Sequence, residues 1–168
     1  MSTTEAPILP EVGKPAPAIR LPDDTGALRD LAEERGRWVV LYFYPADDTP
    51  GCTTEACQFR DSHAAFLGMG ATVWGISKLG SASKAAFKAK HGLNYPLLAD
   101  EDHDVARRYG VWVEKKQYGR SSMGIARSTF LIDPGGRVAH IWESVKADGH
   151  AAEVMAALGS VPASDPAR

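Results

Sequence analysis

Two cysteines, Cys52 and Cys57, carry the most nucleophilic side chains of this 168-residue chain. The segment 44–51 before them contains two prolines, two aspartates, a threonine and a glycine, a composition typical of a loop. Residues 55–61 favour a helix, so Cys52 is expected in or near its first turn. Unpaired N–H groups and the positive end of the helix dipole favour a thiolate there. Because the thiolate is the nucleophilic form of cysteine, the sequence predicts a reactive Cys52.

The spacing of the two cysteines limits how they can react with each other. On an intact α-helix, a separation of five residues places the Cα atoms roughly 8.6 Å apart. A disulfide needs them within roughly 7 Å, so a bond between Cys52 and Cys57 would require the first helical turns to unwind. We therefore predict a redox switch, with the helix folded when reduced and locally unfolded when oxidised. Pro50 and Gly51 provide a weak start for such unwinding.

Two other interpretations of the cysteines stay open at this point. Either one can be an inert small core residue, and this alternative carries more weight for Cys57 than for Cys52. A metal site is disfavoured, because Cys-x4-Cys differs from the Cys-x2-Cys spacing of zinc sites and no histidine pair lies nearby. We expect neither a metal nor a cofactor.

A reactive thiolate needs a neighbour that stabilises its charge. His63 is a poor candidate, because eleven residues correspond to about 16 Å along the helix axis, and it is expected on the packed face instead. Arg127 is the preferred cation, because it opens an apolar strand where a sheet edge meets a loop. Thr49 is a candidate hydrogen-bonding partner near the sulfur. The alternatives are an exposed edge-strand arginine and a threonine that only shapes the loop or caps the helix.

The elements that position these residues alternate between buried strands and helices. Turn residues and apolar patterning predict a small hairpin from 18–21 and 27–31, and leave 111–124 largely as loop. Further strands are expected at 38–43, 71–77, 95–99, 128–133 and 137–143, and helices at 51–67, 81–91, 102–109 and 148–158. This order predicts one α/β domain over 11–159 around a mixed sheet, with tails at 1–10 and 160–168.

The composition excludes several classes of function. The net charge of −2 shows no basic excess that would favour nucleic acid or an anionic membrane surface. No apolar run approaches the ~20 residues of a membrane span. The first ten residues lack the basic and apolar regions of a signal peptide, so a cytoplasmic location is expected. Two cysteines are too few for a disulfide framework and, in a reducing compartment, indicate redox or metal chemistry.

Around these residues the chain resembles the peroxiredoxins, specifically the bacterioferritin-comigratory or Q type. The core signature Pro-x-x-x-Thr-x-x-Cys is matched by Pro45, Thr49 and Cys52, and the surrounding string 43–61 is highly specific to this type. Further matches lie at 109–112 and 127–133, and the resemblance covers roughly residues 11–159. Two departures are minor: Ala46 replaces a lysine that often follows the proline, and Lys78-Leu79 replaces a common Pro-Asp.

The resemblance implies a thioredoxin-like fold and thiol-dependent reduction of hydrogen peroxide and organic hydroperoxides. Cys52 would be the peroxidatic cysteine, which becomes a sulfenic acid, and Cys57 the resolving cysteine, which forms a disulfide with it. Pro45 would shield the pocket, Thr49 would hydrogen-bond the peroxide, and Arg127 would hold the thiolate and polarise the peroxide. Thioredoxin or a similar dithiol would reduce the disulfide. A monomer and a weak homodimer are both compatible with the sequence.

Two other classes of function could use a pair of reactive cysteines. A protein dithiol-disulfide oxidoreductase is disfavoured, because such enzymes use Cys-x-x-Cys. Insulin reduction without peroxide would separate it from a peroxidase. A redox-sensing module, in which oxidation of Cys52 and Cys57 gates a partner, would react with peroxide slowly and without turnover.

Overall fold

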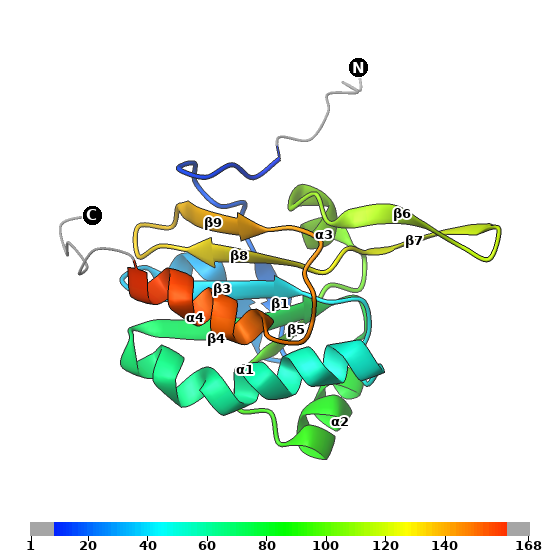
Figure 1. Ribbon diagram of the computed structural model, residues 1–168, viewed down its shortest axis with the longest axis horizontal. Coiled ribbons are helices and arrows are strands. Elements are labelled where there is room, and N and C mark those ends of the chain that lie inside the picture. The colour runs from blue at the N-terminus through cyan, green and yellow to red at the C-terminus, as the bar shows by residue number, and fades with distance from the viewer. Residues whose placement is uncertain (1–8, 161–168) are drawn as a thin grey trace.

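A computed structural model of the chain describes residues 9–160, whose centre is a five-stranded mixed sheet (Figure 1). The strand order is β5-β4-β3-β8-β9, with β3, β4 and β5 parallel and with β8 and β9 antiparallel to their neighbours. The strands are β3 (Trp38–Phe43), β4 (Ala71–Ser77), β5 (Leu97–Ala99), β8 (Ser128–Ile132) and β9 (Val138–Trp142). All six residues of β3 are buried, which explains its continuous apolar run.

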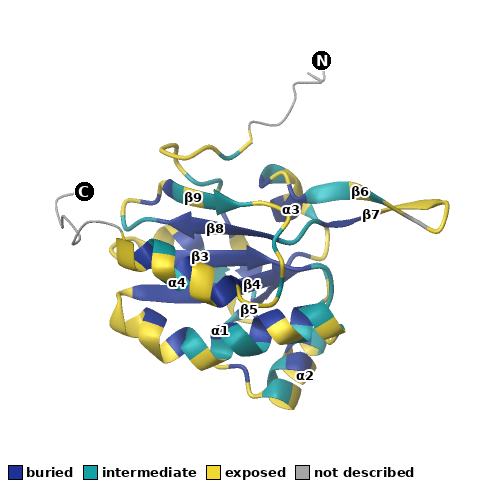
Figure 2. Ribbon diagram, in the orientation of Figure 1, coloured by how far each residue is buried: buried dark blue, intermediate teal, exposed yellow. Residues whose placement is uncertain are grey.

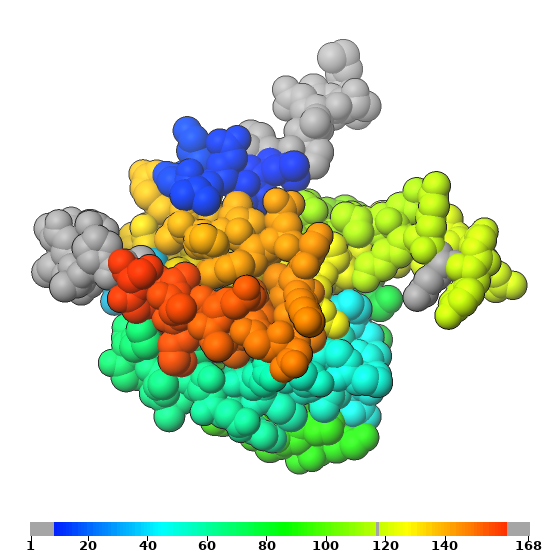
Figure 3. Space-filling view, viewed as in Figure 1, coloured from blue at the N-terminus to red at the C-terminus, as the bar shows by residue number. Residues whose placement is uncertain are grey.

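Alternate residues of β3 divide the core into two layers. Val40 and Tyr42 face a cluster that also contains residues of α1 (Pro50–Gly68), α2 (Ser81–His91) and α4 (His150–Ser160). Val39, Leu41 and Phe43 face the opposite cluster, which includes residues of α3 (Asp104–Arg108) and the N-terminal segments. Helices α1 and α4 pack side by side on one face of the sheet, as the space-filling view shows (Figure 3). The sheet is therefore covered on both faces.

Most predicted elements are confirmed within a few residues. The N-terminal hairpin consists of β1 (Arg20–Pro22) and β2 (Leu28–Asp30), and a short 3-10 helix follows at Leu31–Glu34. The predicted tails fall mainly on residues 1–8 and 161–168, which lie outside the described residues, so the domain limits stay a prediction. None of the helices within residues 9–160 is both long and apolar enough to cross a bilayer.

The prediction of a loop over 111–124 is wrong. These residues form an antiparallel hairpin of β6 (Trp112–Gln117) and β7 (Arg120–Ile125), which makes its own two-stranded sheet. The turn residues Tyr118 and Gly119 both have positive φ, as a tight two-residue hairpin turn requires. The hairpin projects from the body, and its far end is exposed (Figure 2). Because neither face of that end is buried, its sequence lacks the apolar alternation that identifies strands.

Candidate active site

The loop after β3 places Cys52 in the first turn of α1, as the sequence predicts. Thr49 is the N-cap residue, and its carbonyl accepts the first helical hydrogen bond from the Thr53 amide at 2.8 Å. Pro50 occupies the first helical position, where its missing N–H costs no hydrogen bond. Cys52 is only 1% exposed and belongs to the core cluster beneath α1. The amides of the first turn have no intrahelical acceptor, so they favour negative charge at this end of the helix.

Arg127 reaches the sulfur from the strand side of the site. Its Nη2 donates to Cys52 Sγ at 3.3 Å, and its Nη1 donates to Glu55 Oε1 at 2.6 Å. The arginine immediately precedes β8, and its backbone carbonyl accepts a hydrogen bond from the Val145 amide. Burial opposes the positive charge, but Glu55 and Cys52 outweigh it and raise the pKa of Arg127. The structure thus brings together two residues that are 75 positions apart in the sequence.

Glu55 is a residue of the site that the sequence analysis missed. It is completely buried, and burial raises the pKa of its carboxyl to about 7 although the adjacent Arg127 lowers it. Its second oxygen, Oε2, has no hydrogen-bond partner among the described residues. Glu55 follows Cys52 by three positions, and residues so spaced share one helix face. That spacing was the available signal, because a carboxylate facing inward beside a reactive thiol needs a cation.

Thr49 and Pro45 lie in the loop that precedes Cys52, and both are half-buried. The Thr49 hydroxyl donates to the Ala46 carbonyl at 3.3 Å, which closes the loop on itself. Among the described residues, no hydrogen bond joins Thr49 to Cys52. The structure therefore places these two residues in the loop that leads into the first turn of α1, and their action on a peroxide stays a prediction.

Cys57 lies one and a half turns beyond Cys52 on the same intact helix, and both are free thiols. It is half-buried, and its neighbours tie α1 to the rest of the fold. The Tyr95 hydroxyl donates to the Ala56 carbonyl at 2.9 Å. The side-chain amide of Gln58 donates through Nε2 to Asp148 Oδ1 at 2.7 Å, and its Oε1 accepts from the backbone amide of Gly149 at 2.8 Å. Any disulfide between the cysteines must therefore form after the helix start has come loose.

His63 packs in the core, as expected from its place on the helix. It is buried, and its ring lies edge-on to Tyr95 with the ring centroids 5.6 Å apart. Burial lowers the pKa of His63. Within residues 9–160, no group of three or more histidine, cysteine, aspartate or glutamate side chains could hold a metal ion.

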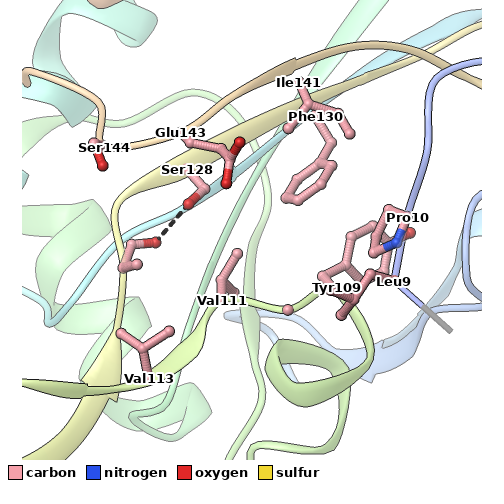
Figure 4. Close-up of a pocket in the computed structure, with 12 residues that line it drawn as sticks. Leu9, Pro10, Tyr109, Val111, Val113, Ser128, Phe130, Ile141, Glu143 and Ser144 are labelled. Atoms are coloured by element: carbon pink, nitrogen blue, oxygen red, sulfur yellow. Dashed lines mark hydrogen bonds between the residues drawn. The ribbon is translucent and has the colours of Figure 1, made fainter. Parts of the chain in front are cut away.

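A separate cavity of about 340 Å³ lies beside the segment that carries Arg127 (Figure 4). Apolar side chains such as Val111, Phe130 and Ile141 line it, together with Ala126 and Ser128 on either side of Arg127. The Arg127 side chain extends toward α1 instead, where it contacts Cys52 and Glu55. The cavity is therefore distinct from the site around the sulfur.

The chain is similar in sequence to one family and to several of its curated members. Residues 12–141 match the AhpC/TSA family. The peroxiredoxin Bcp of Bacillus subtilis is 46% identical over 148 residues, which are 88% of this chain and 94% of the relative. The peroxiredoxin Bcp of Escherichia coli is 40% identical over 140 residues, which are 83% of this chain and 90% of the relative.

Solved structures show the same likeness. A mutant of Xylella fastidiosa PrxQ superposes with a TM-score of 0.86 at 35% identity, covering 90% of this chain and 96% of that chain. The bacterioferritin comigratory protein of Xanthomonas campestris, studied for its alkyl peroxide reduction activity, superposes with a TM-score of 0.83 at 39% identity. That comparison covers 89% of this chain and 98% of the other. These likenesses confirm the predicted thioredoxin-like fold.

Proposed function

The chain belongs to the AhpC/TSA family and is a peroxiredoxin, and on this premise we propose that Cys52 is the residue that reduces hydrogen peroxide and organic hydroperoxides. The observation that carries the proposal is the Arg127 guanidinium 3.3 Å from a buried sulfur in the first turn of a helix. An ionised donor stabilises a thiolate and the charge that develops beside it. The studied alkyl peroxide reduction activity of the Xanthomonas campestris relative supports the substrate class.

In the first step, the Cys52 thiolate attacks one oxygen of the peroxide. A sulfur–oxygen bond forms, the O–O bond breaks, and the leaving oxygen takes a proton to give water or an alcohol. Arg127, Thr49 and the amides of the helix start stabilise the charge that moves across the O–O bond. Pro45 shields the pocket from water. Cys52 is left as a sulfenic acid.

In the second step, the start of α1 unwinds, and the Cys57 thiol attacks the sulfenic acid. A disulfide forms and water leaves. A thioredoxin-like dithiol then reduces the bridge by thiol–disulfide exchange, and a reducing compartment such as the cytoplasm would supply it. Neither nucleic acid nor a membrane has a part in this cycle, and the cycle can run in a monomer or a weak homodimer.

Mass spectrometry tests this two-cysteine cycle directly. After one equivalent of hydrogen peroxide, we expect the native chain to lose two hydrogens and both free thiols. The Cys57→Ser variant should stop at a sulfenic acid or its overoxidised products, because its resolving thiol is absent. A native chain that stops at sulfenic acid would make Cys57 structural. A Cys52 that does not react within seconds would contradict the peroxidase assignment itself.

Gln58 offers a test of the unwinding step. We expect Gln58→Ala to form the disulfide up to about thirtyfold faster, because it removes two hydrogen bonds that hold α1 to the loop before α4, each contributing about 1 kcal/mol. Faster resolution leaves less time for a second peroxide, so the sulfinic fraction measured by mass spectrometry over a peroxide series should fall. Asp148→Ala removes one of the two bonds and should have a smaller effect. An unchanged sulfinic fraction in Gln58→Ala would show that unwinding stops short of this residue.

A further inference from the structure

Helix α2 holds both aspartates of the loop between Pro45 and Thr49. The side chain of Asp47 is almost completely buried, with Lys84 Nζ 3.3 Å from Oδ1 and the Ser83 hydroxyl donating to Oδ2 at 2.7 Å. Asp48 is 45% exposed and pairs with Lys90 at 2.8 Å and His91 at 3.1 Å. Ion pairs exposed to water contribute little, so the buried Asp47 pair is the stronger link.

Lys84 is the centre of the buried link. Its side chain is 0% exposed, which is rare for a lysine unless it is fully paired. Besides Asp47, its ammonium donates to the Ser77 hydroxyl at 2.5 Å and to the Tyr44 hydroxyl at 3.3 Å. These contacts use all three N–H donors of the lysine. Tyr44 in turn donates to Asp47 Oδ1 at 2.5 Å, which closes the network.

This network fixes the loop from three sides. The carboxylate of Asp47 contacts Lys84, which lies in α2, and Tyr44, which directly follows β3. Ser77, the last residue of β4, accepts a hydrogen bond from Lys84 and so holds the lysine in place. Asp47 lies two residues from Pro45 and two residues from Thr49. Two residues of chain span at most about 7 Å, so a fixed Asp47 restricts the backbone of both neighbours.

We propose that Lys84 is a positioning residue for peroxide reduction, which acts through Asp47 to hold Pro45 and Thr49 in the geometry that the peroxide requires. Among the described residues, the hydrogen bonds of Lys84 Nζ go to Asp47, Ser77 and Tyr44 and none goes to the Cys52 sulfur. This inference rests on the proposed function of Cys52. Displacing reacting groups by about 1 Å can slow a reaction by about 10²-fold, so the effect of losing Lys84 is measurable.

The test compares two reactions of the same thiol. Reaction with hydrogen peroxide needs the positioned loop, whereas alkylation by iodoacetamide needs only an accessible thiolate. We expect Lys84→Met to lower the second-order rate constant for hydrogen peroxide by about tenfold or more. Its alkylation rate should stay near the wild-type value or rise. Both rates are measured by stopped flow and quenched mass spectrometry on protein whose circular dichroism shows that it is folded.

Matched variants separate positioning from general loss of stability. Lys88→Met changes the same residue type on the same helix, where the lysine pairs with Asp24 at 3.2 Å, and should keep the wild-type ratio of the two rates. Asp47→Asn should give the same loss as Lys84→Met, and the double variant should lose no more than either single one, because both break one link. Asp47→Asn retains oxygen and nitrogen atoms for Tyr44 and Ser83, so it carries the test if Lys84→Met does not fold.

Two results would overturn the inference: wild-type rate ratios in both Lys84→Met and Asp47→Asn, or a double variant whose loss is the product of the single losses. A wild-type chain that is alkylated at Cys52 but does not react with peroxide would instead contradict the proposed function.

Discussion

Replacing Arg127 with alanine is expected to slow the reaction of Cys52 with hydrogen peroxide by about 10²–10³-fold, the usual effect of removing one donor that stabilises developing charge. The structure gives the reason: Nη2 of Arg127 donates to the Cys52 sulfur, and the side chain is mostly buried at 16% exposure. In such a buried site charges are weakly screened, so water does not substitute for the missing guanidinium. Stopped-flow measurement of the second-order rate constant checks this result.

The variant Arg127→Lys tests whether a positive charge alone can replace the guanidinium. Arginine binds Glu55 through Nη1 and Cys52 through Nη2 at the same time, and a lysine ammonium cannot reproduce that planar fork. We therefore expect Arg127→Lys to recover only a small part of the lost rate. Arg37→Ala, which changes an arginine that is 57% exposed and pairs with Glu34, serves as the control. A rate constant for Arg127→Ala within threefold of wild type would contradict the assigned role.

Glu55 should make the stability of the fold depend on pH. Burial raises the pKa of Glu55 from 4.5 to about 7, so the folded state binds this proton more tightly than the unfolded state does. The resulting stabilisation is fully present below about pH 4.5 and is lost as pH rises through about 7. At 1.36 kcal/mol per pKa unit, the loss is on the order of 3 kcal/mol.

Glu55→Gln removes the titrating carboxyl, so the difference in unfolding free energy between the native chain and the variant isolates its contribution. Urea unfolding of both proteins at pH 5, 6, 7 and 8 should show the free energy of unfolding of the native chain falling relative to the variant across this range. Other groups titrate in both proteins and cancel in the difference. Glu33→Gln, at an exposed carboxylate, should run parallel to the native chain. Parallel curves for Glu55→Gln would show that the Arg127 pair keeps the carboxyl ionised throughout.

The parts of the site that could be predicted are those encoded locally. The apolar run of β3, the loop residues after it and the helix formers beyond 55 place Cys52 correctly, because each pattern has a direct physical cause in its own segment. The thioredoxin-like fold followed from the resemblance and is confirmed by the solved structures. The Cys52–Arg127 pairing was also predicted, but only as the preferred choice among alternatives.

The missed features depend on contacts between distant segments. Lys84 lies in a helix rich in lysine and alanine, where a lysine ordinarily faces water. Only its position three residues before the buried Phe87 indicates the inner face, and its partner Asp47 is 37 residues away. The β6–β7 hairpin was missed for a different reason, because its far end is exposed on both faces and carries no apolar alternation to detect.

The separation of 75 positions in sequence between Cys52 and Arg127 has a consequence for the newly made protein. A ribosome adds roughly 5–20 residues per second, so Arg127 is synthesised about 4–15 s after Cys52. During that interval the nascent chain has neither the guanidinium nor strand β8, which pairs with the centre of the sheet. If Arg127 activates Cys52 as proposed, Cys52 gains its full reactivity toward peroxide only after Arg127 has been synthesised. Until then Cys52 lacks the hydrogen-bond donor on which the proposed reaction depends.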